Sequence, residues 1–169
     1  EACKKSKNKE LYYIVLTALY TGMRYSNIVN MKKSKIQGNI YQLDGSETKS
    51  GKGQFICIHQ DLLDELNKYM LECDNGEYIF KTKEVKRSFK TALKQADIKY
   101  FRFHDLRRTF ATTLLDNGTS IKVIQYVLGH SSIMMTERYL AHNSKKELDA
   151  IKKLCFINRS ERKDKGEYL

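Results

Sequence analysis

Residues 103–130 read FHDLRRTFATTLLDNGTSIKVIQYVLGH and predict two short helices in succession. The first of them covers 105–116. Ser120 then caps a second helix over 121–128, which ends at Gly129. Serine side chains accept hydrogen bonds at helix starts, and glycine readily takes the left-handed conformation at helix ends. This pair of helices indicates a mainly helical chain.

Six more helices are expected from apolar residues at helical spacing. One begins near residue 11 and ends at Gly22, and the short helix after it has Ser26 as a candidate N-cap. Asp61 is expected to cap a third, and 85–96 forms the clearest amphipathic helix of the chain. Ser131 or Ser132 is expected to cap a helix that holds Tyr139, and a last apolar stripe consists of Leu148, Ile151 and Leu154.

The periodicity changes between residues 35 and 58, where strands are expected. Residues 40–43 and 54–58 can each form a strand, and a glycine-rich tip over 48–53 joins them as an exposed basic hairpin. Cys57 is expected to pack there as a small hydrophobic residue. The predicted fold class is therefore α+β: mainly α-helical, with a small three-stranded antiparallel β-sheet.

Length and composition favour a single domain over residues 1–169. The chain is 41% apolar and 30% charged, and it is long enough to bury a sizeable core. Its longest near-continuous apolar stretch, 11–20, is about half of the roughly 20 residues that a spanning helix requires, which excludes a membrane span. Residues 1–9 are expected to form a linker or a frayed end, and 158–169 a loose charged tail.

The cysteines and the motifs that are missing exclude several kinds of chemistry. The four cysteines are scattered without a C-x-x-C pair, so no zinc site or disulfide framework is expected and a reducing cytoplasm is favoured. No Walker-type loop, G-x-G-x-x-G or H-E-x-x-H motif occurs. Neither a metal nor another cofactor is therefore expected.

A strong positive charge points to a polyanionic partner, with nucleic acid favoured over a merely solvated basic surface. The formal net charge is +11, and more than half of it lies between residues 81 and 102. That window contains eight basic residues and two acidic ones, Glu84 and Asp97. The basic residues are Lys81, Lys83, Lys86, Arg87, Lys90, Lys94, Lys99 and Arg102.

Several side chains that could act on a phosphate stand beside predicted helix ends or turns. His104 and Arg107 are three residues apart, which places both on one face of their helix. His130 directly follows a helix end, and Arg24 comes two residues after another. Taken one at a time, such residues are more often surface or structural groups than catalytic ones.

Four segments together resemble the tyrosine recombinase (phage integrase) family, in the family's order and with its gaps. They are Thr21-Gly22-Met23-Arg24, His104-Asp105-Leu106-Arg107-Arg108-Thr109-Phe110-Ala111-Thr112, Leu128-Gly129-His130-Ser131-Ser132 and Thr136-Glu137-Arg138-Tyr139-Leu140-Ala141-His142. The resemblance covers about 11–154. It implies the catalytic-domain fold of that family, without the N-terminal core-binding domain that usually completes the DNA clamp.

The resemblance also implies a role for each of six side chains. Two arginines hold the scissile phosphate, two histidines surround it, a hairpin lysine protonates the leaving 5′ oxygen, and a tyrosine attacks to form a 3′-phosphotyrosyl link. The two arginines are Arg24 and Arg107, and the two histidines are His104 and His130. The lysine is Lys49, and the attacking tyrosine is Tyr139. Paired guanidinium donors suit the charge that develops on the phosphate oxygens. The covalent ester retains the bond energy, so religation requires no ATP.

The implied partner is double-stranded DNA, which places the protein with the nucleoid in the cytoplasm. Arg108 stands where the family often has a histidine and is expected to add a phosphate contact, whereas Asn27 replaces a usual acidic residue and is expected to alter a supporting contact to Arg24. Lys52 lies on the same hairpin as Lys49 and is the alternative catalytic lysine. The expected DNA contacts are Lys52, Lys81, Lys83, Lys86, Arg87, Lys90, Arg102 and Arg108.

Three alternatives stay open. Type IB topoisomerases use similar chemistry, but they relax supercoils and do not exchange strands. A non-catalytic helix-turn-helix module over 119–139 would make Tyr139 and Lys49 incidental. The stripe over 148–154 either packs on its own domain or docks on a neighbouring protomer of a DNA-bound homotetramer.

Overall fold

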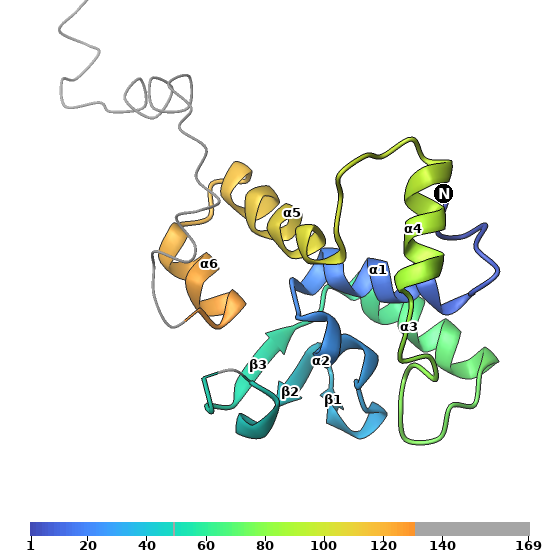
Figure 1. Cartoon of the computed structure of the whole chain (residues 1–169). Coiled ribbons are helices and arrows are strands. Elements are labelled where there is room, and N and C mark those ends of the chain that lie inside the picture. The colour runs from blue at the N-terminus through green and yellow to red at the C-terminus, as the bar shows by residue number, and fades with distance from the viewer. Residues whose placement is uncertain (49, 131–169) are drawn as a thin grey trace, which may run out of the picture. The chain divides into compact units, whose positions relative to one another are not determined.

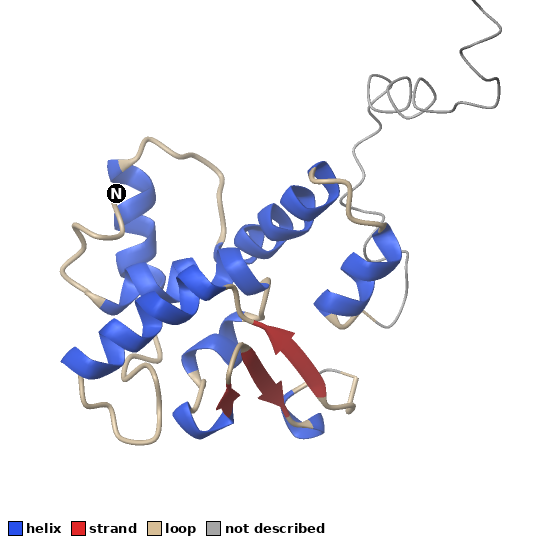
Figure 2. Ribbon diagram, turned by 180° about the vertical axis from the view of Figure 1, so that it is seen from behind, coloured by secondary structure: helices blue, strands red, loops and turns tan. Residues whose placement is uncertain are grey.

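The computed structural model describes residues 1–48 and 50–130 and is mostly helical with one small sheet (Figures 1 and 2). Predictions about Lys49, Tyr139, the 148–154 stripe and the tail lie outside the described residues. The helices are α1 (Glu10–Thr21), α2 (Tyr25–Val29), α3 (Gln60–Glu72), α4 (Lys86–Gln95), α5 (Phe103–Asp116) and α6 (Ile121–Leu128). The strands are β1 (Ile36–Gln37), β2 (Ile40–Leu43) and β3 (Gln54–Cys57), with 3₁₀ turns at Lys33–Lys35 and Gly45–Glu47. The predicted fold class is confirmed.

Helix α1 lies at the centre of the main hydrophobic core. Leu11, Ile14 and Ala18 are fully or almost fully buried on it, and the helix packs against α2, α3 and α5. It ends at Gly22, as predicted, because Gly22 adopts the left-handed conformation (φ 62°) and donates its N–H to the Ala18 carbonyl. The end of α1 lies against α5, because the Gly22 carbonyl accepts a hydrogen bond from Arg107 of that helix.

The sheet is antiparallel with the order β1-β2-β3. Tyr41 pairs with Ile56, and both side chains are buried, whereas Phe55 and Cys57 lie on the exposed face. The prediction that Cys57 packs in the core is therefore wrong. The residues from 55 to 58 are all apolar, so alternation alone did not decide which face of this strand is buried.

Two predicted helix caps are also wrong. Helix α3 is capped by His59, whose Nδ1 accepts from the backbone N–H of Asp61 at 3.2 Å. Arg24 is the N-cap residue of α2, so Ser26 lies inside the helix.

Helix α5 begins two residues before the predicted start, because the Asp105 carboxylate accepts a hydrogen bond from the Arg102 N–H at 2.8 Å.

Helix α6 matches its prediction at both ends, with Ser120 as N-cap and Gly129 as left-handed C-cap. It packs on α5 through a second small cluster, whose buried members are Ala111, Ile124 and Leu128. Residues 1–9, which were expected to be a linker or a frayed end, form turns, and Ala2 and Cys3 pack partly buried against the main core.

Candidate active site

Arg107 joins three segments that lie far apart in the sequence. Its side chain is on the second turn of α5, and the residue is only 5% exposed. Nη1 donates to the Gly22 carbonyl at 2.6 Å, and Nη2 donates to the Leu128 carbonyl at 2.5 Å. Carbonyls at helix C-terminal ends have no partner within the helix and carry partial negative charge. One buried guanidinium therefore fixes the ends of α1 and α6 against α5.

His130 lies next to this guanidinium, immediately after Gly129, and is 9% exposed. Its backbone is held by Gln125, whose carbonyl accepts from the His130 N–H at 3.0 Å and whose Nε2 donates to the His130 carbonyl at 3.2 Å. Burial lowers the pKa of His130 to about 4, and the positive charges of Arg107, Arg24 and His104 contribute to the shift. The imidazole is therefore neutral at pH 7.

His104 lies in the first turn of α5. Partial burial lowers its pKa, and the charge of Arg107 lowers it further, while Asp105 opposes the shift. Asp105 itself accepts from the backbone N–H of Arg102 and forms ion pairs with Arg102 at 3.4 Å and Arg108 at 3.6 Å. These contacts lower the pKa of Asp105, the backbone hydrogen bond most of all.

Arg24 approaches the same place from the loop after α1. It is half-buried, and its backbone carbonyl accepts from the N–H groups of Asn27 and Ile28 as α2 begins. The Asn27 side chain accepts from the Ser26 hydroxyl at 3.4 Å. The positive charge of Arg24 also lowers the pKa of His130.

The structure thus brings together four of the six predicted catalytic side chains: Arg24, His104, Arg107 and His130. Lys49 and Tyr139 lie outside the described residues. The four come from three separate segments of the chain. The charges of Arg107, Arg24 and His104 all lower the pKa of His130. A cluster of this kind favours an anionic ligand such as a phosphodiester.

The hairpin between β2 and β3 reaches the end of α6, immediately before His130. Gln54 donates from Nε2 to the Val127 carbonyl at 2.7 Å. Lys52 is exposed, and its carbonyl accepts from the Thr48 hydroxyl at 2.7 Å. Sequence reasoning missed both Gln54 and Gln125. The only available signal was Gly129, because a glycine at a tight turn allows another segment to approach closely.

The predicted DNA contacts differ in their surroundings. Lys81, Lys86, Arg87 and Lys90 are exposed on or just before α4. Lys83 instead donates from Nζ to the Val29 carbonyl at 2.7 Å, with the ammonium 4.0 Å from the centre of the Tyr78 ring. That lysine helps to fix the end of α2. Arg102 and Arg108 are exposed, and both form ion pairs with Asp105.

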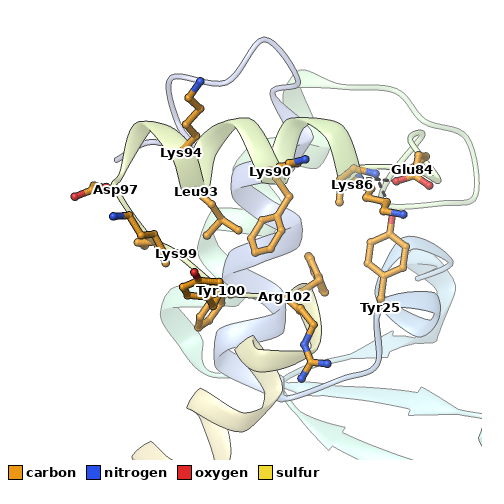
Figure 3. Close-up of a pocket in the computed structure, with 15 residues that line it drawn as sticks. Tyr25, Glu84, Lys86, Lys90, Leu93, Lys94, Asp97, Lys99, Tyr100 and Arg102 are labelled. Atoms are coloured by element: carbon orange, nitrogen blue, oxygen red, sulfur yellow. Dashed lines mark hydrogen bonds between the residues drawn. The ribbon is translucent and has the colours of Figure 1, made fainter.

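A cavity of about 1150 Å³ lies between α4 and the segment that leads into α5 (Figure 3). Phe89 and Leu93 contribute to its apolar lining, while Lys86, Lys90 and Lys94 line it from α4. Tyr100 is fully exposed in the opposite segment, with a φ of 56°. The cavity therefore adjoins the basic surface of α4.

Neither a metal cluster nor a spanning helix is found in the described part of the chain. No group of three or more His, Cys, Asp or Glu side chains within residues 1–48 and 50–130 could hold a metal ion. Among the same residues, every helix is too short or too polar to cross a bilayer.

Most of this chain matches a known protein family in sequence. The model of the phage integrase family matches residues 1–146. The integrase of Haemophilus phage HP1 is 34% identical over 151 residues, which are 88% of this chain and 42% of that protein. The tyrosine recombinase XerA of Pyrococcus furiosus is 34% identical over 152 residues, 83% of this chain and 53% of XerA. The chain thus spans about half the length of these relatives.

Solved structures of an integrase and a recombinase have the same fold as this chain. The catalytic domain of bacteriophage HP1 integrase superposes with a TM-score of 0.72 at 30% identity, covering 90% of this chain and 86% of that domain. XerA recombinase superposes with a TM-score of 0.72 at 26% identity, covering 88% of this chain and 60% of XerA. The predicted resemblance is confirmed: with a matched family model over most of its length and this fold, the chain belongs to the phage integrase family.

Proposed function

We propose that this protein is a site-specific DNA recombinase that cuts and rejoins DNA through a 3′-phosphotyrosyl intermediate. The observation that carries the proposal is the buried Arg107 guanidinium, held by the ends of α1 and α6 beside Arg24 and His130. Two guanidinium groups at one place suit a scissile phosphate, since each can offer paired donors to its oxygens.

In the proposed cleavage step, the Tyr139 oxygen attacks the phosphorus and the bond to the 5′ oxygen breaks. A phenol has a pKa near 10 and is a weak nucleophile at pH 7, so a base has to take its proton. His130 suits that role because its imidazole is neutral. The negative charge of a bound phosphate raises the pKa of His130 and makes it a stronger base.

The leaving 5′ oxygen takes its proton from Lys49, which gives a free 5′-hydroxyl. Rejoining is the reverse reaction: a 5′-hydroxyl attacks the phosphotyrosyl ester, and Tyr139 leaves. The ester retains the energy of the broken phosphodiester bond, so neither ATP nor another energy source is needed. Fixed cations from Arg24 and Arg107 supply the charge that stabilises the transition state, and the reaction then proceeds without a metal ion.

DNA binding in this proposal uses the basic surface of α4. Lys86, Arg87 and Lys90 contact backbone phosphates, which strengthens binding without reading the sequence. Helices in the major groove supply part of the sequence choice. Four protomers assemble on the paired sites, with the segment over 148–154 docked on a neighbouring protomer.

A suicide substrate tests the proposal. This is a nicked duplex from which the short fragment that carries the freed 5′-hydroxyl diffuses away after cleavage, so that the covalent complex is trapped. Wild-type protein is expected to give a denaturation-resistant protein–DNA adduct in the presence of EDTA, whereas Tyr139→Phe binds the duplex but forms no adduct. An adduct with Tyr139→Phe would show that the nucleophile is a different residue.

The same preparation separates the alternatives. A recombinase joins strands between two cognate sites, whereas a type IB topoisomerase relaxes supercoils without exchanging strands. Recombinant product from two sites supports the proposal, and relaxation without recombinant product favours the topoisomerase. Tight binding without any adduct favours a non-catalytic module.

A further inference from the structure

Gln54 connects the β2–β3 hairpin to the end of α6. It is the first residue of β3, where its partner in the ladder is Leu43 of β2. Its Nε2 donates to the Val127 carbonyl at 2.7 Å and lies 3.5 Å from the Tyr126 carbonyl. Both carbonyls belong to the last turn of α6, where carbonyls lack the usual partner four residues on, and the Tyr126 carbonyl also accepts from the Gly129 N–H at 2.9 Å. A side chain of the hairpin therefore satisfies a helix end 73 residues away.

Gly129 allows this contact to be close. A Cβ atom added at Gly129 would lie 2.5 Å from Oε1 and 3.0 Å from Cδ of Gln54, so the carboxamide lies directly against the glycine. The neighbours of Gly129 are the two residues that matter for the phosphate site. Leu128 accepts the hydrogen bond from Arg107, and His130 is the buried imidazole.

We propose that Gln54 is a positioning residue that holds the hairpin against residues 127–130 and so sets the geometry of leaving-group protonation. This inference rests on the proposed function, in which the hairpin lysine donates a proton to the 5′ oxygen. Gln54 is on the strand that leads out of the hairpin tip, and the tip contains both candidate lysines. A small displacement of a general acid lowers its effectiveness strongly, because proton transfer requires hydrogen-bond distance.

The chemistry of the leaving group gives a way to test this role. With a natural substrate the bond from phosphorus to the 5′ oxygen breaks, and the oxygen takes a proton. With a bridging sulfur in place of that oxygen, the phosphorus–sulfur bond breaks and the 5′-thiolate leaves without a proton, since a thiol has a pKa near 8.5. A defect confined to protonation should therefore disappear with the sulfur substrate.

The experiment compares single-turnover cleavage of the oxygen and sulfur suicide duplexes by wild type, Gln54→Ala and Gln54→Glu. The glutamate variant keeps the size of the side chain and loses the NH₂ donor. Both variants are expected to cleave the oxygen substrate about tenfold more slowly, as the loss of one such hydrogen bond implies. Both are expected to cleave the sulfur substrate at the wild-type rate and to bind DNA within about twofold of wild type.

Gln42→Ala is the matched control, because Gln42 lies on β2 of the same sheet and is exposed. Its rates should equal those of wild type on both substrates. If Gln54→Ala and Gln54→Glu cleave the oxygen substrate at the wild-type rate, the inference is overturned. It is also overturned if each variant cleaves the oxygen and sulfur substrates with the same reduction in rate, because that indicates a purely structural role. Failure of wild type to cleave either duplex would instead overturn the proposed function, and this inference with it.

Discussion

The Arg107 guanidinium donates a 2.6 Å hydrogen bond to the carbonyl of Gly22, which lies 85 residues earlier in the chain and two residues before Arg24. The same guanidinium also holds the Leu128 carbonyl, two residues before His130. A single side chain thus holds the chain two residues before each of two other candidate catalytic residues. Arg107 would serve both the stability of the fold and the binding of a phosphate.

Replacing Arg107 should therefore affect both properties. Arg107→Lys cannot satisfy two carbonyls with the same paired geometry. We expect cleavage of the suicide substrate to slow by about 10²–10³-fold. We also expect urea unfolding to show a loss of about 3 kcal/mol for the two buried hydrogen bonds. Lys68→Arg on the exposed face of α3 is the control and should change neither value appreciably. Wild-type cleavage by Arg107→Lys would contradict the role of this residue.

Gly22 is expected to tolerate no side chain. A Cβ at this position would lie 2.4 Å from Cδ1 of Phe110 and 2.9 Å from Cδ2 of Leu128, and φ is 62°. Gly22→Ala should cost about 3 kcal/mol or more of unfolding free energy, because strain at positive φ adds to overpacking. Gly118→Ala isolates the backbone strain, since φ is 84° there and nothing lies within 4 Å of the added atom. Equal losses for the two variants would contradict the close packing at Gly22.

The low pKa of His130 predicts a specific pH dependence of stability. In the folded protein this pKa is about 4, below the usual 6.5, so between these values the unfolded chain binds more protons. The unfolding free energy should fall by up to about 3 kcal/mol as the pH drops from 6.5 to 4. His130→Gln should lose this dependence, which urea titrations at several pH values would measure.

NMR titration provides an independent check of the charges around His130. Arg24→Ala removes one of the cations that lower this pKa, so the His130 resonance should titrate at higher pH than in wild type. A short phosphodiester duplex should shift the pKa upward as well. Titration of His130 near 6.5 in the free wild-type protein would contradict the burial and the charge cluster described here.

The basic surface of α4 should contribute mainly salt-dependent, sequence-independent affinity. Lys86→Ala and Lys90→Ala are each expected to weaken binding to cognate and unrelated duplexes alike. Each should also reduce the slope of log K against log salt by about 1. Lys68→Ala on α3 is the control for a general charge effect. An unchanged salt slope for both α4 variants would place the DNA elsewhere.

Local signals in the sequence predicted much of the fold. Gly22 and Gly129 mark helix ends because each adopts a left-handed conformation, and Ser120 marks a start by accepting from a backbone N–H. Those features depend on a few neighbouring residues. The buried face of β3 was not predictable in this way, because apolar residues occupy both faces and the contacts with the rest of the core decide which face is buried.

The candidate site was also only partly predictable from the sequence. Its arginines and histidines were identified from the order of short motifs, which does not give their geometry. The contacts of Gln54 with Val127 and Gly129 span more than 70 residues, so spacing within one element could not indicate them. The hydrogen bonds of Arg107 to two helix ends are equally long-range. Tertiary packing, and not local propensity, creates these relationships.

The most direct test of the account identifies the residue that becomes joined to DNA. The adduct trapped on the suicide substrate is digested with protease and nuclease, and the modified peptide is sequenced by mass spectrometry. We expect a nucleotide 3′-phosphate on Tyr139 and on no other residue. Attachment to another tyrosine, such as the exposed Tyr126 of α6, or a phosphate attached through its 5′ end, would contradict the proposed reaction.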